Sequence, residues 1–403
     1  MRNLRQLFLS LIAALGRPLV RRAVPVRRIV YLKPDHLGDV LLATPVLAEL
    51  RAVFPTAQIS ALVGPWSRVV LAGNPHVDAL LVCPYPGFER AGQQPTVGKN
   101  SLYGWFRLFV RRLAAPARPY STLLRYAALL RVGRYDLAIV GRDDHWWGAA
   151  LALLAGIPRR VGFAVPECRP FLTDALPWNP SEHVTVQGLA LVAASADTQR
   201  HGEGAQQPTR FYPPAADSAW AAEWQTMHMA HEQFVVIHPG TGGPTKHWHD
   251  VRWAAVANAL ADVGVQVVLT GGPGEEARVA RVAVGMRTRP LLLAGKTTVG
   301  QLAALMGRAA LVLGVDSGPL HLAAAMGVPT VHLYGPGDDA RFGPWGDPIH
   351  HVVLHSDIWC RPCGVFSACP RGLAQPACME QIAVASVIAA ARQALGLHAA
   401  HSH

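Results

Sequence analysis

Short apolar runs alternate with longer segments of helical periodicity along this chain, and the alternation occurs twice, which leaves few possible folds. The first series predicts strands at 29–32, 58–63, 79–83, 135–140 and 160–163. The second series predicts strands at 234–238, 266–270, 291–294, 311–315 and 330–334. Such alternation is typical of parallel sheets covered by helices. We therefore predict an α/β protein with two doubly wound, Rossmann-like domains, which face across a cleft that holds two substrates.

A polar stretch rich in Pro and Gly separates the two series. The chain has 403 residues, more than the ~150 to 250 that usually share one core, which also favours two domains. The expected boundaries are residues 25–200 for the first domain, 201–216 for a linker and 217–403 for the second domain. Aromatic and basic residues interrupt the first series at about 84–134, where we expect an insertion.

The net charge of +11 comes from two local stretches. Residues 1–28 contain seven Arg, residues 91–134 contain seven Arg and one Lys, and neither stretch contains an acidic residue. The rest of the chain is slightly acidic, unlike the extended basic surface of a nucleic-acid-binding protein. Apolar residues lie between the basic ones in both stretches, as in segments that bind membrane surfaces. We predict contact with an anionic membrane surface and none with nucleic acid.

Residues 1–24 are predicted to form a basic amphipathic helix in the membrane interface. Its apolar side chains recur at helical spacing and include Leu4, Leu7, Phe8, Leu11, Leu15 and Leu19. A signal peptide is disfavoured because Arg17, Arg21 and Arg22 follow the apolar run with no small-residue cleavage site before them. The run is also too short to span a bilayer. A surface helix packed on its own domain remains the alternative.

The first strand is followed by Lys33-Pro34-Asp35-His36-Leu37-Gly38-Asp39-Val40, which opens a helix. Asp39 would face the cleft, where its carboxylate can accept the proton of an attacking hydroxyl. The positive end of the helix dipole would stabilise the charged carboxylate and lower its basicity. The alternative is that Asp39 caps the helix, because Asp is a favoured capping residue.

The second series has a glycine-rich loop after its first strand, with the sequence His238-Pro239-Gly240-Thr241-Gly242-Gly243-Pro244-Thr245-Lys246-His247-Trp248. Backbone N–H groups in such a loop, which includes Thr241 and Gly242, can bind diphosphate oxygens, and Lys246 supplies a positive charge. The spacing fits neither a Walker A loop nor GxGxxG. An ordinary turn between a strand and a helix is the alternative.

A third motif, Gly314-Val315-Asp316-Ser317-Gly318-Pro319-Leu320-His321, also joins a strand to a helix. Ser317 and Gly318 would present free N–H groups at a helix N-terminus, which is an anion site, and Gly318 would let a ligand approach the backbone. His321 would lie over the turn and donate to a phosphate or a sugar. Alternatively, Asp316 and Ser317 cap the helix and His321 is a satisfied interior residue.

Three weaker signals remain. Glu275 follows a glycine-rich turn after a strand and either binds a ribose or starts the next helix. Asp143-Asp144 is expected to be structural or to face a substrate. The spacing of Cys360, Cys363, Cys369 and Cys378 fits no common zinc module, so zinc binding, buried thiols and a redox-labile pair all remain open.

Together these loops resemble glycosyltransferase family nine, the bacterial heptosyltransferases that build the inner core of lipopolysaccharide from ADP-heptose. The resemblance spans about residues 27–390, with the three motifs in the family's order. The matching residues are Lys33 and Gly38-Asp39-Val40 with Thr44-Pro45, Arg51 and Phe54-Pro55; His238-Pro239-Gly240 with Lys246-His247-Trp248; and Gly314 to Gly318 with His321 and Tyr334-Gly335-Pro336.

The resemblance implies a GT-B fold, with an N-terminal domain that binds the acceptor and a C-terminal domain that binds the nucleotide-sugar donor. It implies that Asp39 is the catalytic base, that Lys246 contacts the donor, and that Asp316 to Gly318 with His321 hold the diphosphate and sugar. Together with the loops described above, the predicted donor-binding residues are Thr241, Gly242, Lys246, Glu275, Asp316, Ser317, Gly318 and His321, and Lys33 and His36 are predicted on the acceptor side. No metal and no cofactor are implied.

The expected function is therefore inverting, metal-independent transfer of heptose from ADP-heptose to a lipid-linked saccharide, by an enzyme bound peripherally to the cytoplasmic side of the inner membrane. Pro273 stands near the place where some heptosyltransferases carry a ribose-binding acid, so a donor with another base is one alternative. The others are a different acceptor, a nucleotide-sugar-binding protein that has lost the chemistry, and an epimerase of similar fold.

Overall fold

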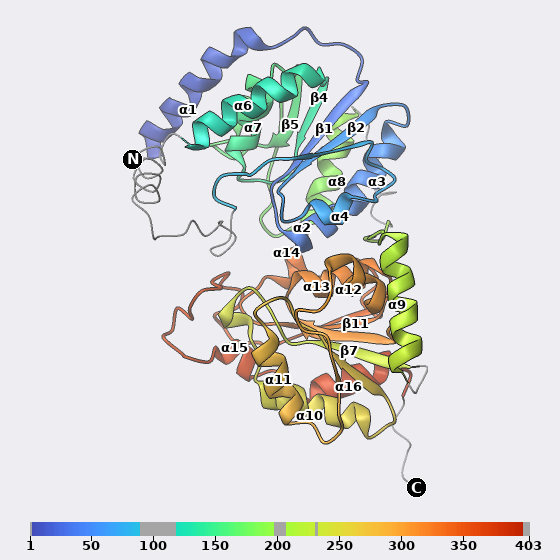
Figure 1. Ribbon diagram of the computed structural model, residues 1–403. Coiled ribbons are helices and arrows are strands. Elements are labelled where there is room, and N and C mark those ends of the chain that lie inside the picture. Colours follow the sequence, from blue (N-terminus) through green and yellow to red (C-terminus); the bar gives the residue numbers. More distant parts are fainter. Residues whose placement is uncertain (1, 89–117, 197–206, 230–232, 398–403) are drawn as a thin grey trace, which may run out of the picture.

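The computed structural model describes residues 2–88, 118–196, 207–229 and 233–397. These residues form two α/β domains stacked end to end (Figure 1). No helix in the described ranges is both long and apolar enough to cross a bilayer. The predicted fold class is confirmed.

The first domain is built on six parallel strands in the order β3-β2-β1-β4-β5-β6, which is the order of a doubly wound Rossmann-like sheet. The strands are β1 (Arg28–Lys33), β2 (Gln58–Val63), β3 (Ala79–Val82), β4 (Leu137–Val140), β5 (Arg159–Phe163) and β6 (Asp174–Leu176). The helices are α1 (Arg2–Gly16), α2 (Leu37–Leu41), α3 (Thr44–Val53), α4 (Arg68–Leu71), α6 (Arg118–Gly133), α7 (Trp146–Leu154) and α8 (Val184–Ser195), with short 3-10 turns at η1 (Arg17–Leu19) and η3 (Arg169–Phe171).

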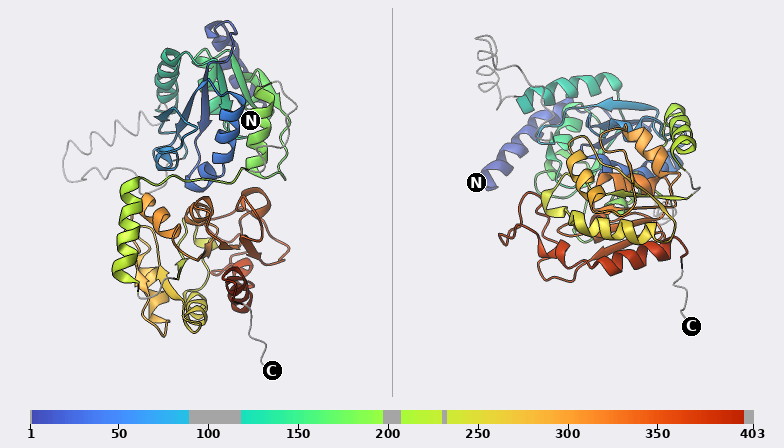
Figure 2. Two further views of the ribbon diagram at one scale, coloured as in Figure 1. Left: turned by 90° about the vertical axis from the view of Figure 1, so that its right-hand side faces the viewer. Right: turned by 60° about the horizontal axis from the view of Figure 1, so that its bottom comes forward.

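Both faces of the first sheet are buried, because successive residues of a strand point to opposite faces. Ile29 and Tyr31 of β1 pack into the layer that contains α2, α3 and α8. Val30 and Leu32 pack into the layer that contains α1, α6 and α7. Figure 2 (left) shows this sheet between teal α6 on one side and blue α3 with light-green α8 on the other. The sheet is therefore a fixed platform whose strand ends can hold a site.

The second domain repeats the architecture with the strand order β12-β11-β10-β7-β8-β9, again all parallel. Its strands are β7 (Phe234–His238), β8 (Gln266–Leu269), β9 (Leu291–Leu292), β10 (Leu311–Val315), β11 (Thr330–Tyr334) and β12 (His351–His355). Its helices are α9 (Ala215–His228), α10 (Asp250–Ala261), α11 (Glu276–Val284), α12 (Val299–Met306), α13 (Gly318–Ala325), α14 (Asp339–Phe342), α15 (Ala377–Glu380) and α16 (Val384–Ala394), and η5 (Pro244–Lys246) is a 3-10 turn.

The two domains share part of their apolar core. Helices α10 and α16 cover one face of the second sheet, while α9, α12 and α13 cover the other. The layer formed by α9, α12 and α13 belongs to the same buried cluster as α2, α3 and α8 of the first domain. This shared apolar cluster fixes the position of one sheet relative to the other.

All ten predicted strands occur, with bounds that match or differ by one or two residues. Two further strands, β6 and β12, were not predicted from the sequence. Each lies at the edge of its sheet. β6 has three residues and begins with Asp174, and β12 begins and ends with His, so neither carries the long apolar run that marks a buried central strand.

Most of the predicted insertion, residues 89–117, lies outside the described residues. Its described end is α6, which buries Leu123, Ala127 and Leu130 against the layer that contains α7. This helix connects β3 to β4 and covers the sheet, so residues 118–133 belong to the core of the domain and are not peripheral.

The predicted linker is described only from residue 207 onward. Helix α9 begins at Ala215, so it includes the last two residues of the predicted linker, 201–216. The N–H of Arg210 donates to Oγ1 of Thr44 in the first domain at 3.0 Å. The N–H of Phe211 donates to the carbonyl of Ala325 in the second domain at 3.2 Å. The described part of this segment is thus fastened to both domains.

Candidate active site

The strand order of each sheet reverses between β1 and β4 in the first domain and between β7 and β10 in the second. Loops diverge at such a point and leave a crevice, which is the usual ligand position in doubly wound sheets. The three sequence motifs follow β1, β7 and β10, and residues 141–144 follow β4. All four loops that border these crevices therefore carry polar residues that can contact a ligand.

Helices α2 and α13 meet at the junction of the domains, and glycines allow their close approach. A Cβ atom at Gly38 would lie 3.0 Å from Cδ2 of His321. A Cβ atom at Gly318 would lie 2.9 Å from Cδ2 of Leu37. The first motif and the third motif are thereby brought into direct contact across the two domains.

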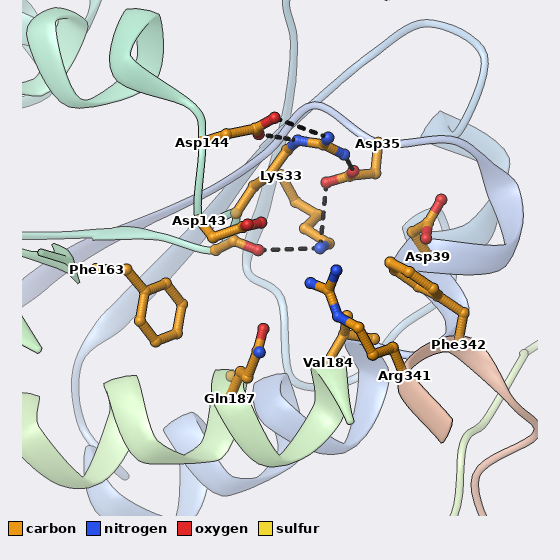
Figure 3. Close-up of a pocket in the computed structure, with 13 residues that line it drawn as sticks. Lys33, Asp35, Asp39, Asp143, Asp144, Phe163, Val184, Gln187, Arg341 and Phe342 are labelled. Carbon is orange, nitrogen blue, oxygen red and sulfur yellow. Dashed lines mark hydrogen bonds and ion pairs between the residues drawn. The ribbon is translucent and has the colours of Figure 1, made fainter. Parts of the chain in front are cut away.

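A pocket of about 160 Å³ opens beside α2 (Figure 3). Most of its wall comes from the first domain, and α14 of the second domain completes it. The lining residues are Lys33, Asp35, Asp39, Gly141, Arg142, Asp143, Asp144, Phe163, Val184, Gln187, Gly188, Arg341 and Phe342. Asp39, the predicted base, and Lys33 thus line the same pocket. Asp143 and Asp144 also line it, which agrees with the alternative that they face a substrate.

Four charged side chains form a linked cluster on one wall of the pocket (Figure 3). The Lys33 ammonium lies 3.1 Å from Oδ2 of Asp35 and donates to the carbonyl of Gly141 at 2.9 Å. Arg142 joins Asp35 to Asp144, with its Nε 2.5 Å from Oδ1 of Asp144. Burial alone would raise the pKa of Asp35, but Lys33 and Arg142 lower it overall. Asp35 therefore stays charged and anchors the cluster.

Asp39 differs from its paired neighbours. It is the third residue of α2, and its carboxylate has no ion pair or hydrogen bond with the described residues. Burial first, and then the charge of Asp35, raise the pKa of Asp39 to about 6, although Lys33 and Arg142 act in the opposite direction. The pKa of Asp39 thus moves in the direction opposite to the predicted effect of the helix dipole, because of burial and of the charge of Asp35. The capping alternative is wrong, since His36 occupies the N-cap position.

The second and third motifs are joined by side-chain contacts across the β7/β10 crevice. Nζ of Lys246 lies 3.1 Å from Oδ2 of Asp316 and 4.6 Å from the centre of the Phe366 ring. Oγ1 of Thr241 donates to the carbonyl of Asp316 at 3.3 Å. Lys246 is thus held at the end of a loop that can bind an anion, and a diphosphate can replace Asp316 as its partner.

Two polar side chains at the start of α13 each have a buried atom with no hydrogen-bond partner in the described part of the chain. Ser317 occupies the N-cap position, but its hydroxyl makes no capping hydrogen bond. Within the described residues, Oγ of Ser317 and Nδ1 of His321 are buried without a hydrogen-bond partner. Burial lowers the pKa of His321 to about 4, so its ring is neutral at pH 7. Buried polar atoms are normally satisfied, so these two atoms, together with the N–H groups near Gly318, indicate a place for a ligand or water.

Glu275 contacts the glycine-rich loop from the side. Its Oε2 accepts a hydrogen bond from the N–H of Gly272 at 2.6 Å and lies 3.7 Å from Nε2 of His238. A Cβ atom at Gly240 would lie 2.0 Å from the same oxygen, so this approach requires glycine at position 240. Gly242 is exposed in the same loop. The carboxylate therefore lies beside the glycine-rich loop that follows β7.

His36 is separated from Lys33, the other residue predicted for the acceptor side. Its ring packs edge-on against Trp66, with the centroids 5.5 Å apart, and it does not line the pocket. The indole N–H of Trp66 donates to the carbonyls of Pro34 and Asp35 at 3.1 and 3.0 Å. His36 thus contributes to the packing that holds the first motif in place.

The four clustered cysteines are unpaired thiols, of which Cys378 is buried and Cys363 is exposed. Burial raises the pKa of Cys378, and Cys363 and Cys360 raise it further. Among the residues that the structure describes, no three His, Cys, Asp or Glu side chains come together as metal ligands. The zinc alternative therefore finds no support in this arrangement, and the thiol alternatives remain.

Several pocket residues were missed by sequence reasoning. Arg142 directly follows β4, and its position at a strand end was a signal that was not used. Asp35 lies within the first motif but was not singled out. Gln187 on α8 and Arg341 on α14 come from distant segments and carry no local sequence signal. Only the fold brings them to the pocket.

The comparisons with known proteins agree with this architecture. The family model described as "Glycosyltransferase family 9 (heptosyltransferase)" matches residues 123–368. Lipopolysaccharide heptosyltransferase 1 of Pseudomonas aeruginosa is 34% identical over 348 residues, which cover 83% of this chain and 86% of that protein. The glycosyl transferase family 9 structure from Veillonella parvula superposes with a TM-score of 0.71 at 25% identity, covering 93% of this chain and 99% of that one.

The structure of the E. coli ADP-heptose lps heptosyltransferase II has the same fold, with a TM-score of 0.66 at 20% identity over 91% of this chain and 98% of that one. The fold neighbours therefore confirm the GT-B architecture implied by the sequence resemblance. The chain belongs to glycosyltransferase family 9, the heptosyltransferase family, and is a glycosyltransferase.

Proposed function

We propose that this enzyme transfers a heptose from ADP-heptose to a hydroxyl of a lipopolysaccharide core or related glycolipid, with inversion at the anomeric carbon and without a metal ion. One observation carries the proposal: the unpaired carboxylate of Asp39 lies in the pocket with its pKa raised to about 6. A general base is most effective when its pKa lies near the working pH. Asp39 also lies on the helix that packs on α13 of the second domain, so a hydroxyl bound there is close to the donor.

In the proposed reaction, an oxygen of Asp39 accepts the proton of the acceptor hydroxyl while the hydroxyl oxygen attacks the anomeric carbon. The new C–O bond forms on the face opposite the nucleotide, and the bond from the anomeric carbon to the diphosphate oxygen breaks. ADP leaves with the electron pair of that bond. Asp39 then returns its proton to water, which a carboxyl group of pKa about 6 does readily at pH 7.

The charge that develops on the leaving diphosphate needs preorganised partners. Lys246 supplies a full positive charge, and the N–H groups at the start of α13 supply partial charges. The buried hydroxyl of Ser317 and ring nitrogen of His321 have no other partner among the described residues and can donate to phosphate or sugar oxygens. We assign these groups, with Thr241 and Gly242, to the donor, and Glu275 to its ribose.

The identity of the donor and acceptor rests on relatives. The Pseudomonas aeruginosa relative is a lipopolysaccharide heptosyltransferase, and the E. coli structure is described as an ADP-heptose enzyme. Glu275 supports a donor that contains a ribose, because an acidic residue after such a turn binds the ribose hydroxyl. It does not distinguish adenine from another base.

A donor panel tests the proposal. Calorimetry is expected to show tighter binding of ADP-heptose than of UDP-glucose or GDP-mannose, and mass spectrometry is expected to show ADP and a heptosylated core oligosaccharide only when both substrates are present. Binding of ADP-heptose without turnover on any acceptor would instead indicate a binding protein. Conversion of the donor without an acceptor would indicate an epimerase.

We also propose that the enzyme acts at the cytoplasmic face of the inner membrane, to which α1 and α6 attach it. Both helices pack on α7, so they lie on the same side of the first domain (Figure 1). α1 turns Leu9 and Ala13 inward and leaves large apolar side chains exposed, so it packs on its domain and still presents an apolar face. The exposed side chains are Leu7, Phe8, Leu11, Leu15 and Leu19 on α1 and η1, and Tyr120, Leu124, Leu129 and Val132 on α6.

This surface combines apolar side chains with arginines that include the exposed Arg17, Arg125 and Arg131. Basic residues near an anionic surface contribute about 1 kcal/mol each, and the attraction weakens with salt. Two such weak contacts on one face would hold the enzyme beside a lipid-linked acceptor more firmly than either alone.

Replacing Leu7, Leu11 and Leu15 by Gln tests the membrane contact more cleanly than removing residues 1–24, because removal would also uncover the part of α7 that Leu9 and Ala13 cover. The triple variant should bind vesicles with anionic phosphatidylglycerol weakly and keep its activity on a soluble acceptor fragment. Val251 and Val284 of the second domain are even more exposed, so their change to Gln is the control and should not alter binding. Unchanged vesicle binding of the triple variant would remove α1 from the membrane surface.

A further inference from the structure

The wall of the pocket formed by α14 carries a cation that belongs to the donor domain. Arg341 extends from α14 into the pocket, in which the other charged side chains belong to the first domain (Figure 3). Lys33 and Arg142, the other two cations of the lining, are paired with Asp35 and Asp144. Within the described residues, the side chain of Arg341 has neither an ion pair nor a hydrogen bond, and its Nε is buried.

Aromatic rings hold this guanidinium in one place. It lies 5.6 Å from the centre of the Trp178 ring in the first domain and 4.9 Å from that of Phe342 in the second. The N-cap residue of α14, Asp338, accepts a hydrogen bond from the N–H of Arg341, so the backbone is fixed as well. Stacking of this kind orients the plane of the guanidinium and leaves its N–H donors directed sideways.

A half-buried guanidinium without a partner is unfavourable, so the free protein retains a cost that a bound anion can remove. Figure 3 shows the guanidinium pointing into the pocket toward the end of Lys33. The Lys33 ammonium has three donors, of which Asp35 and the Gly141 carbonyl use two. Asp39 and Asp143 also line this space, but neither pairs with Arg341 among the described residues, which leaves the guanidinium as the place for an oxyanion.

We propose that Arg341 binds an oxyanion of the acceptor saccharide, a carboxylate or a phosphate, and thereby positions the attacking hydroxyl at Asp39. This inference rests on the proposed transfer reaction. The rigid fork of Arg matches the oxygens of a carboxylate or phosphate in a bidentate manner. Because Arg341 comes from the donor domain and the rest of the charged wall from the acceptor domain, the acceptor site is complete only when the two domains are together.

The test compares Arg341→Met with Arg371→Met, a control in which the arginine stacks on the exposed Trp359 at 5.6 Å, away from the pocket. The acceptors are a native core oligosaccharide, the same oligosaccharide after removal of its phosphates, and a form with its carboxylates reduced. Arg341→Met should raise KM for the native acceptor about 10- to 100-fold, as expected for hydrogen bonds to a charged group. Arg341→Lys should restore part of that loss.

The form of the acceptor on which Arg341→Met and wild type become equal identifies the bound group as phosphate or carboxylate. An equal loss on all acceptors, including one from which both groups have been removed, would overturn the proposal. A loss of ADP binding by calorimetry would also overturn it, because Arg341 would then contact the donor. If the wild-type enzyme transfers no heptose, the proposed function fails, yet direct calorimetry of the native oligosaccharide against the two Met variants still decides the role of Arg341.

Discussion

Asp35 and Asp39 lie four residues apart, yet their pKa values shift in opposite directions. Asp35 is buried and Asp39 is half-buried, and loss of contact with water by itself raises the pKa of a carboxyl group. Lys33 and Arg142 pair with Asp35 and lower its pKa, whereas Asp39 is unpaired and lies near the charge of Asp35. Environments that separate the pKa values of two carboxyl groups assign them different roles. Asp35 is suited to hold charges in place, and Asp39 to exchange a proton.

The raised pKa of Asp39 predicts an acid limb in the pH profile of the transfer rate. The base must be deprotonated to act, and a group with a pKa of about 6 is about one-tenth deprotonated at pH 5. The value of kcat/KM for transfer should therefore fall about tenfold from pH 8 to pH 5, because this quantity follows the pKa of the free enzyme. Steady-state kinetics measures it, with circular dichroism confirming that the protein stays folded. A rate unchanged down to pH 5 would mean that Asp39 keeps an ordinary acidity or is not the base.

For single residues, the sequence identified which side chains lie at the site but not their pKa values or their ion-pair partners. Lys33 ends a strand and Asp39, Lys246, Asp316 and His321 follow strands, where doubly wound folds place ligands. The direction of the pKa shift of Asp39 could not be predicted, because it depends on burial between two domains and on the paired state of Asp35. The pairing of Lys246 with Asp316 depends in the same way on two strands that are adjacent only in the folded sheet.

Among the elements, the contact between α2 and α13 joins the helix of the proposed base to the helix of the proposed donor site. The helices meet through Gly38 and Gly318, each of which leaves room for a side chain of the other helix. Sequence patterns predicted both helices, since each follows a strand and a turn. They did not predict that the helices touch, because nothing in either segment encodes a partner from the other domain.

Enlarging Gly38 should separate these helices. Its Cβ would lie 3.0 Å from the His321 ring, so Gly38→Ala requires a small shift and Gly38→Val a larger one. A displacement of about 1 Å in an active site can cost about 100-fold in rate, so turnover should fall progressively from Gly to Ala to Val. Steady-state kinetics measures the series, and Ala128→Val on the exposed side of α6 controls for added bulk. Wild-type turnover in Gly38→Val would show that the contact does not position the base.

For the whole molecule, the positions of the central strands were the most predictable feature, and the core shared by the two domains was the least predictable. Ten strands followed from apolar runs, because a parallel sheet buried on both faces needs continuous apolar segments. The edge strands β6 and β12 lack such runs. The core that continues from α8 to α12 arises from apolar faces whose pairing is visible only in three dimensions.

The second domain also buries several neutral histidines, which predicts instability in acid. Burial lowers the pKa of His238 to about 4 and that of His332 well below its ordinary value. The unfolded chain then binds more protons than the folded one below pH 6.5, so stability falls as the pH decreases from 6.5 toward 4, by up to ~1.4 kcal/mol per pH unit for each such histidine. Urea unfolding at pH 7, 6 and 5 measures the slope.

His332→Leu should flatten this dependence, whereas changing the exposed His350 to Gln should not. Equal slopes for the wild type and His332→Leu would show that the buried ring is not responsible for the loss of stability.

The rate of heptosyl transfer by Asp39→Asn at saturating ADP-heptose, measured together with the Kd for ADP-heptose, tests the assignment of the base most directly. Asparagine keeps the size of the side chain but cannot accept the proton, so the rate should fall by ~100-fold or more while the Kd changes little. Asp262→Asn, at an exposed ion pair with Arg287, is the control and should retain the wild-type rate. A near-normal rate for Asp39→Asn would contradict the proposed mechanism.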